Sequence, residues 1–177
     1  MSLVHVTGIS GAGKSTVRAE LSARGFVAHD VDEDGYKSWY RRDSGTRARE
    51  QRAWADTDRS WQGRYWLKVD RAKVVRLAAE ARAAGGPVFL CGTGPNDDEI
   101  WDLFDIVVNL TISDSVLKHR LGTRMNNDYG KHPDDLADIV GWNGVVAENM
   151  RGWGAVLIDA ERPLADVVDD VVRAASG

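Results

Sequence analysis

The sequence predicts an α/β protein, a three-layer α/β/α sandwich around a five-stranded parallel sheet. Short apolar runs alternate along the chain with longer segments of helical periodicity, which is the pattern of consecutive βαβ units. The 177 residues are 43% hydrophobic and 28% charged, which suits a single globular domain over residues 1–177. Right-handed crossovers would place the carboxyl ends of all five strands at one sheet edge, where ligands bind in such folds.

Each element follows from a local pattern. The apolar runs that predict strands lie at residues 3–6, 26–29, 88–91, 106–110 and 155–158. Helical periodicity covers residues 14–24, 66–84, 116–121, 133–150 and 164–174. Gly25 ends the first helix, and Gly85-Gly86-Pro87 ends the second. The segment 35–65, which is rich in Trp, Tyr and Arg, is expected to be helical and partly open.

The composition excludes several classes of protein. A formal charge of −4 gives no support for a general nucleic-acid or membrane binder, since those are usually basic. The single cysteine, Cys91, leaves no internal disulfide and favours a reducing compartment. No uncharged apolar run approaches the roughly 18 residues that cross a bilayer. Cleaving a signal from the N-terminus would destroy the glycine-rich loop described next, so we expect a cytoplasmic protein without a membrane partner.

The first strand runs into a glycine-rich loop, Gly8-Ile9-Ser10-Gly11-Ala12-Gly13-Lys14-Ser15, which fits the Walker A motif at every position. Glycine allows the positive φ angles that turn backbone N–H groups toward an anion, and the helix that follows directs its positive end at phosphates. We expect Lys14 at the β and γ phosphates, the Ser15 hydroxyl on Mg²⁺ and Thr16 near the α-phosphate. The residues predicted to bind ATP here are Gly8, Ser10, Gly11, Ala12, Gly13, Lys14, Ser15 and Thr16. A plain glycine-rich turn is the alternative, but the complete motif between a strand and a helix favours the phosphate site.

Two carboxylates, Asp30 and Asp32, follow the second strand. Their spacing of two places both side chains on the same side, at the sheet edge that carries the loop. A kinase needs one carboxylate near the metal and another that holds or deprotonates the acceptor hydroxyl. We assign Asp30 to the metal and Asp32 to the acceptor, although the two roles could be exchanged. A solvated acidic turn is the alternative.

The order of motifs resembles the shikimate kinase and nucleoside monophosphate kinase group of P-loop proteins. The resemblance spans nearly the whole chain and rests on the Walker A loop, the Asp30-x-Asp32 pair, Gly92-Thr93-Gly94, Arg120-x-x-x-Arg124 and Ile158-Asp159-Ala160. It implies a P-loop NTPase fold with strand order 2-3-1-4-5. It also implies a mobile lid over ATP, which residues 120–131 would form because they are polar, rich in cations and contain glycine.

The resemblance also implies roles for individual residues. Arg120 and Arg124 would be catalytic lid arginines that steady the phosphates. The remaining implied contacts are Asp159, Ala160 and Pro163 near the adenine, and Gly92, Thr93 and Gly94 with backbone N–H groups exposed to the acceptor. The third strand ends without a Walker B aspartate, so the metal would depend on Ser15 and Asp30. The segment 35–65 lacks the arginine arrangement expected for shikimate and any clear nucleoside monophosphate signature, so the acceptor does not carry over.

These observations predict a small-molecule kinase that uses ATP and Mg²⁺. The acceptor, such as a nucleoside, nucleotide, sugar or shikimate-like hydroxyl compound, would lie between Asp32, Gly92 to Gly94 and the segment 35–65. Two alternatives stay open. One is a polynucleotide-end kinase whose arginines between residues 41 and 52 hold phosphates. The other is a nucleotide-dependent regulatory ATPase that has no small-molecule acceptor.

Overall fold

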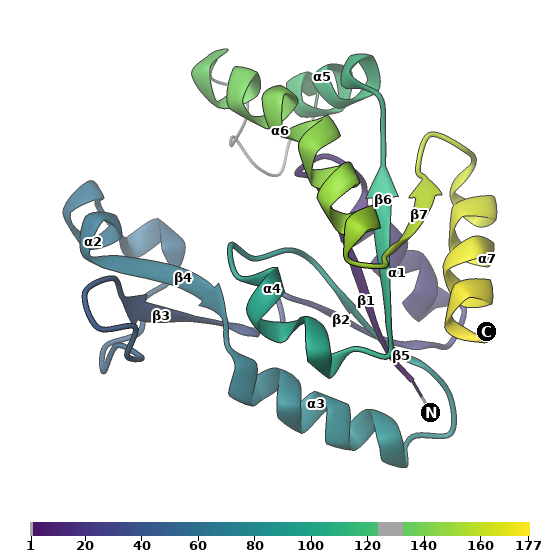
Figure 1. Cartoon of the computed structure of the whole chain (residues 1–177), viewed down its shortest axis with the longest axis horizontal. Helices are drawn as coiled ribbons and strands as arrows, with labels where there is room; N and C mark the ends of the chain where they lie inside the picture. Colours follow the sequence, from purple (N-terminus) through teal and green to yellow (C-terminus); the bar gives the residue numbers. More distant parts are fainter. Residues whose placement is uncertain (1, 124–132) are drawn as a thin grey trace.

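The computed structural model describes residues 2–123 and 133–177 (Figure 1). Five strands form the main sheet in the order β2-β5-β1-β6-β7, and all neighbouring pairs are parallel. They are β1 (Leu3–Gly8), β2 (Val27–Asp30), β5 (Val88–Cys91), β6 (Ile106–Thr111) and β7 (Val156–Asp159). Numbered among themselves, these strands follow the order 2-3-1-4-5. The predicted fold class and topology are therefore confirmed.

Helices cover both faces of this sheet and divide the core in two. On one face, α1 (Lys14–Ala23) and α7 (Leu164–Ala175) pack against apolar side chains of β1, β5 and β6. On the other face, α3 (Arg71–Ala83) packs against Leu3, Val88 and Leu90. Every residue of β1 and β5 is buried, which is why these central strands read as continuous apolar runs in the sequence.

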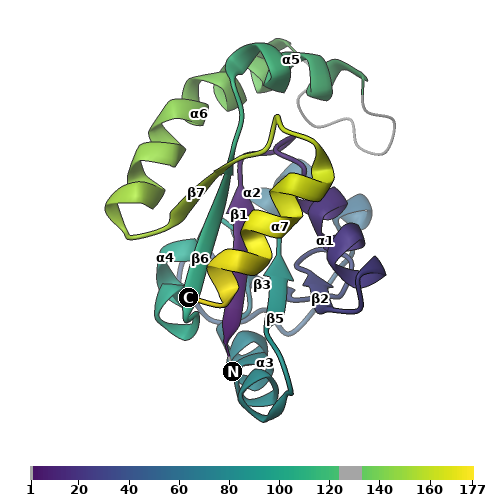
Figure 2. The ribbon, with the colours of Figure 1, turned by 90° about the vertical axis from the view of Figure 1, so that its right-hand side faces the viewer.

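Two helices stand over the carboxyl ends of the strands. They are α5 (Asp114–Thr123), which follows β6, and α6 (Pro133–Gly152), which leads into β7 (Figure 2). Leu117 and Leu121 of α5 and Ile139 of α6 are buried in the same core as α1 and α7. The edge of the sheet that carries the glycine-rich loop therefore lies beneath α5.

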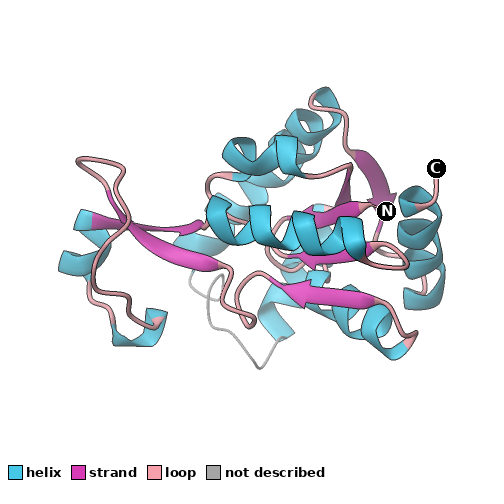
Figure 3. Cartoon of the chain, turned by 90° about the horizontal axis from the view of Figure 1, so that it is seen from below, coloured by secondary structure: helices cyan, strands magenta, loops and turns pink. Residues whose placement is uncertain are grey.

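Residues 37–69 form an arm that projects from the main body (Figure 3). Its frame is a two-stranded antiparallel sheet of β3 (Lys37–Arg41) and β4 (Tyr65–Val69), with a 3₁₀ helix (Trp54–Asp56) and the short α2 (Arg59–Arg64) between them. The expectation of a helical segment at 35–65 is therefore wrong. Trp39, Ala48 and Trp61 form a small separate core with Tyr65 and Leu67 packed on it, so the aromatic residues hold two strands together.

The second predicted helix begins later than expected. Residues 66–69 belong to β4, and α3 starts at Arg71. Asp70 caps that start, because its side chain accepts a hydrogen bond from the N–H of Ala72. The short α4 (Asp97–Ile100) and a 3₁₀ helix (Trp101–Leu103), which follow β5, were not predicted. None of the helices in the described part of the chain has the length and apolar character of a membrane span.

Candidate active site

A cleft of about 1270 Å³ opens at the carboxyl edge of the sheet. Its floor is the glycine-rich loop and the start of α1, residues 10–17. One wall comes from β2, the arm and the loop after β5, through Asp32, Lys37, Trp54, Leu67, Thr93, Gly94 and Pro95. The other wall comes from α5 and from the turn between β7 and α7, through Arg120, Ala160, Arg162, Leu164 and Val167. One continuous cleft therefore extends from the glycine-rich loop to both of these walls.

The loop has the geometry of an anion cradle. Gly8, Gly11 and Gly13 have φ angles of 146°, 91° and 103°, which other residues rarely adopt. A Cβ atom on Gly8 would lie 2.7 Å from the carbonyl oxygen of Leu110. Because β6 lies this close, only glycine fits at this position. Gly13 precedes α1 and has no side chain to cap it. The N–H groups of the first turn of α1 are thus available to an anion.

Lys14 is held inside this cradle. Its Nζ donates hydrogen bonds to the carbonyl oxygens of Gly8, at 2.7 Å, and Ile9, at 2.9 Å. Desolvation lowers the pKa of Lys14 to about 8, and the nearby carboxylates of Asp97 and Asp32 oppose that shift. The ammonium is therefore mostly charged at neutral pH and lies where a bound phosphate would need a cation.

Ser15 and Asp30 meet at the start of α1. The Ser15 hydroxyl lies 3.5 Å from Oδ2 of Asp30, while Oδ1 of Asp30 accepts hydrogen bonds from the N–H groups of Asp32, at 2.8 Å, and Glu33, at 3.0 Å. The Asp30 side chain is thus fixed with one oxygen turned toward Ser15. A hydroxyl and a carboxylate are hard oxygen ligands of the kind that Mg²⁺ takes from a protein, the rest being phosphates and water. Among residues 2–123 and 133–177, no cluster of three or more His, Cys, Asp or Glu offers a self-sufficient metal site.

Asp32 lies apart from Asp30 on the arm side of the cleft. Its carboxylate is exposed, and its Oδ1 is 2.7 Å from Nζ of Lys37 at the start of β3. It lies two residues beyond the end of β2 and lines the cleft. The two carboxylates therefore have different partners, Ser15 for Asp30 and Lys37 for Asp32.

Arg120 connects three parts of the site. Its Nη1 donates to the carbonyl oxygen of Ala12 at 3.2 Å, and its Nη2 donates to that of Ala160 at 2.8 Å. A further contact of 3.5 Å reaches the carbonyl of Gly11. The guanidinium thus joins α5 to the glycine-rich loop and to the turn after β7. Arg124, with the rest of the predicted lid up to residue 131, lies outside the described residues.

A family model described as an AAA domain matches residues 4–141, which is more than half of the chain. The chain belongs to this family. The P-loop of an AAA domain implies nucleotide binding, in agreement with the geometry of the cradle. Comparison with curated proteins found no match.

Solved structures with a similar fold include several kinases. Shikimate kinase from Acinetobacter baumannii in complex with shikimate is 16% identical, with a TM-score of 0.61 over 98% of this chain and 92% of that one. A gluconokinase from Sinorhizobium meliloti 1021 is 21% identical, with a TM-score of 0.54 over 98% and 90%. Deoxyadenosine kinase from M. mycoides with bound dATP is 15% identical, with a TM-score of 0.56 over 100% of both chains. At these identities the likeness concerns the fold, and it confirms the resemblance found in the sequence.

In this AAA domain, the loop after β5 differs from expectation. Thr93 and Gly94 line the cleft, but the N–H of Gly92 donates to Val6 and the N–H of Gly94 donates to Asp97. Both groups are therefore already engaged, so the expectation of N–H groups exposed to an acceptor is wrong for Gly92 and Gly94. Gly92 instead permits a close approach, because a Cβ atom there would lie 2.4 Å from Cβ of Val31.

The predicted adenine contacts are brought only partly into the cleft. Ala160 lines it and accepts the hydrogen bond from Arg120. Asp159 and Pro163, both of which the structure describes, are not among the residues that line the cleft. The Asp159 carboxylate accepts from the N–H of Glu161 at 2.9 Å, and Pro163 immediately precedes α7. The turn therefore reaches the cleft through Ala160 and Arg162.

Asp97 is a residue of the site that the sequence did not reveal. Its side chain is buried at the start of α4 and accepts hydrogen bonds from the hydroxyls of Thr7, at 3.2 Å, and Thr93, at 3.0 Å, as well as from Gly94. Burial alone would raise the pKa of Asp97, but nearby His5 and these donors hold it below its usual value. The resulting carboxylate braces the loop after β5 and provides negative charge near Lys14.

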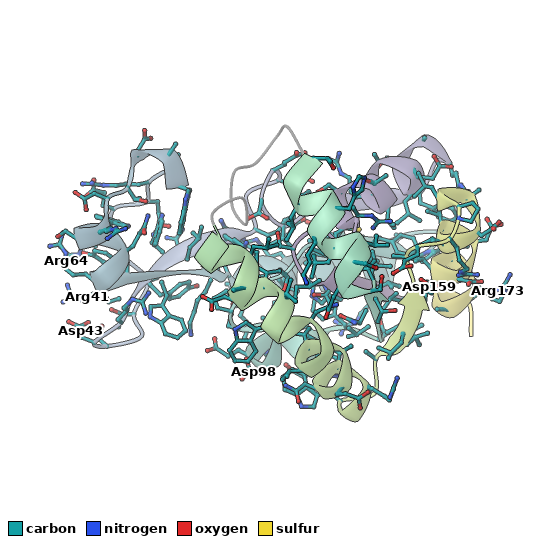
Figure 4. All side chains as sticks on the ribbon, turned by 90° about the horizontal axis from the view of Figure 1, so that it is seen from above. Arg41, Asp43, Arg64, Asp98, Asp159 and Arg173 are labelled. Carbon is teal, nitrogen blue, oxygen red and sulfur yellow. The ribbon has the colours of Figure 1, made fainter. Side chains whose placement is uncertain are left out.

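The arginines of the arm are mostly engaged with the arm itself. Arg41 pairs with Asp43, Arg47 with Asp70 and Arg52 with Glu50, while Arg42 donates to backbone carbonyls of Gln62 and Tyr65. Figure 4 shows Arg41, Asp43 and Arg64 on the opposite side of the molecule from Asp159. This cluster therefore stabilises the arm, and its members are not among the residues that line the cleft.

Proposed function

We propose that this AAA domain transfers the γ-phosphoryl group of ATP to a hydroxyl of a small-molecule acceptor bound between Asp32 and the arm. One observation carries the proposal. A single cleft contains the glycine-rich loop with Lys14 and, on a separate wall, the carboxylate of Asp32, which is not the carboxylate that contacts Ser15. A regulatory ATPase would need the cradle but would have no use for a second compartment beside it.

The residues divide the work of such a transfer. The N–H groups of the loop and the Lys14 ammonium hold the β and γ phosphates. Arg120 on α5 adds positive charge near the phosphates. Asp32 orients the acceptor hydroxyl and accepts its proton. At the same time the new oxygen–phosphorus bond forms and the bond between the γ-phosphorus and ADP breaks. Ser15 and Asp30 would hold Mg²⁺, which neutralises phosphate charge when bound. Placement and charge therefore provide the catalysis.

The test is a screen of ADP production with nucleosides, nucleoside monophosphates, sugars, amino-sugar antibiotics and shikimate-like acids. We expect one class to accelerate ADP release at least about tenfold over the rate without acceptor, and Lys14→Ala to abolish that gain while remaining folded. Asp32→Asn should lower transfer far more than ATP affinity, whereas Asp43→Asn on the arm should change neither. Slow hydrolysis that no acceptor accelerates would contradict the proposal and favour the regulatory ATPase.

The polynucleotide-end alternative receives less support. It depends on free arginines between residues 41 and 52, and four of the five there already bind carboxylates or carbonyls of the arm. Affinity for short RNA or DNA that falls steeply with salt would restore it.

A further inference from the structure

Trp54 is a large aromatic side chain that the arm presents to the cleft. It opens the 3₁₀ helix of the arm and lines the same cleft as the glycine-rich loop. Its side chain is 60% exposed. Trp142 of α6 is equally exposed, at 60%, but is not among the residues that line the cleft. Trp54 is therefore both exposed and located in the cleft, where a bound ligand would meet it.

The ring of Trp54 is backed by a rigid stack. It lies parallel to the ring of Trp39, with centroids 5.8 Å apart and an angle of 10° between the planes. Trp39 is 1% exposed, and its Nε1 donates to the carbonyl oxygen of Arg52 at 2.8 Å. Trp61 closes the far side of Trp39 in an edge-on contact. One face of Trp54 is thus covered, so its exposed area belongs to the other face and the edges.

The wall of the cleft that includes Trp54 also has apolar residues and a charged pair. Leu67 of β4 and Pro95 provide the other apolar surface, and Asp32 with Lys37 provides the charges. The residues that would meet the nucleoside part of ATP, Ala160, Arg162 and Leu164, belong to the opposite wall. Figure 1 shows the arm and the β7–α7 turn on opposite sides of the main body. Trp54 therefore belongs to the acceptor end of the cleft.

We propose that Trp54 is a specificity residue that stacks on a planar aromatic ring of the acceptor. The acceptor class is then a compound that carries such a ring together with a hydroxyl group within reach of Asp32, and nucleosides are the simplest probes of this class. A flat indole face favours planar rings because stacking buries both surfaces. Acids and sugars without an aromatic ring would leave that surface in water. This inference rests on the proposed function, since it names the substrate class of the same site.

The experiment compares four proteins: the wild type, Trp54→Phe, Trp54→Leu and the control Trp142→Leu. Thermal melting first establishes that each is folded. Adenosine, cytidine, shikimate and gluconate are then tested as acceptors in the ADP-release assay, and their affinities in the presence of ADP are measured by calorimetry. ATP affinity is measured for every variant. Phe keeps a flat aromatic face, whereas Leu keeps apolar bulk without one.

We expect transfer to a nucleoside and none to shikimate or gluconate. Trp54→Leu should weaken nucleoside binding by about tenfold or more, the loss that follows removal of a base-stacking ring. Trp54→Phe should retain most of the affinity, and ATP affinity should be unchanged in all variants. Preferred transfer to a ring-free acceptor, or equal nucleoside affinity in Trp54→Leu and the wild type, would overturn the inference and leave the kinase proposal standing. Absence of transfer to all four probes would overturn the inference and count against the kinase proposal too.

Discussion

Lys14 makes the affinity for ATP depend on pH in a range where ordinary lysines do not titrate. Its pKa is lowered to about 8, chiefly by desolvation. Below that pH the ammonium is present in the free protein. Above it, ATP binding must take up a proton to recharge Lys14, and that uptake costs affinity.

We therefore expect ATP affinity to be nearly constant below about pH 7 and to fall as pH rises above 8, approaching about tenfold per pH unit. Calorimetric titration at several pH values measures it. The control is Lys14→Gln, which should bind more weakly and show little change over the same range. Equal affinity of the wild type at about pH 7 and about pH 9.5 would show that the ammonium does not contact the phosphates.

The residues of the site differ in how far the sequence reveals them. The Walker A loop is contiguous, so its eight residues and their cradle follow from local sequence. Asp30 and Asp32 follow from their position after a strand, although only the structure places Asp30 beside Ser15 and Asp32 beside Lys37. Asp97 lies several residues beyond the end of β5 and meets Thr7 from another strand. No spacing rule in the sequence joins those two residues, so tertiary structure alone could show the pair.

Among the elements, the main sheet was predictable and the arm was not. The five main strands are apolar because helices cover both of their faces, which leaves a plain signal in the sequence. In β3 and β4, residues 37–41 pair with residues 65–69 across a long connection, and charged residues interrupt their aromatic pattern. The Ala-rich stretch of α3 also extended the predicted helix backwards over residues 66–69, which belong to β4. Asp70 caps α3, and an aspartate at this position was the feature of the sequence that could have located the true start of the helix.

The junction of β2 and β5 gives a prediction at the scale of elements. Gly92 has a φ of 147°, and a side chain there would clash with Val31 directly after β2. Gly92→Ala should therefore destabilise the fold by about 2 to 4 kcal/mol, through backbone strain and overpacking together. Chemical denaturation measures the change in unfolding free energy.

Gly86 provides the matched control for that substitution. It lies between α3 and β5, and a Cβ atom there would meet no atom within 4 Å. Gly86→Ala should change the unfolding free energy by less than about 0.5 kcal/mol, as open surface sites do. If the two variants were equally stable, β2 and β5 would not approach each other at Gly92 as described.

For the whole molecule, the fold brings several separate parts of the chain to one cleft. The P-loop supplies the cradle, α5 supplies Arg120, and the arm supplies Lys37 and Trp54. Under the function proposed here, the identity of the acceptor would depend on the arm, the part of the fold that the sequence predicted least well.

Everything proposed for the cleft requires that the P-loop bind ATP together with Mg²⁺. Calorimetric titration of ATP into the folded protein, with Mg²⁺ and with a chelator, measures this directly. We predict saturable binding at one site that Mg²⁺ strengthens, that Lys14→Ala weakens by at least about tenfold, and that Asp30→Asn makes less dependent on Mg²⁺. Binding of equal strength in Lys14→Ala and the wild type, or no binding at all, would contradict the account.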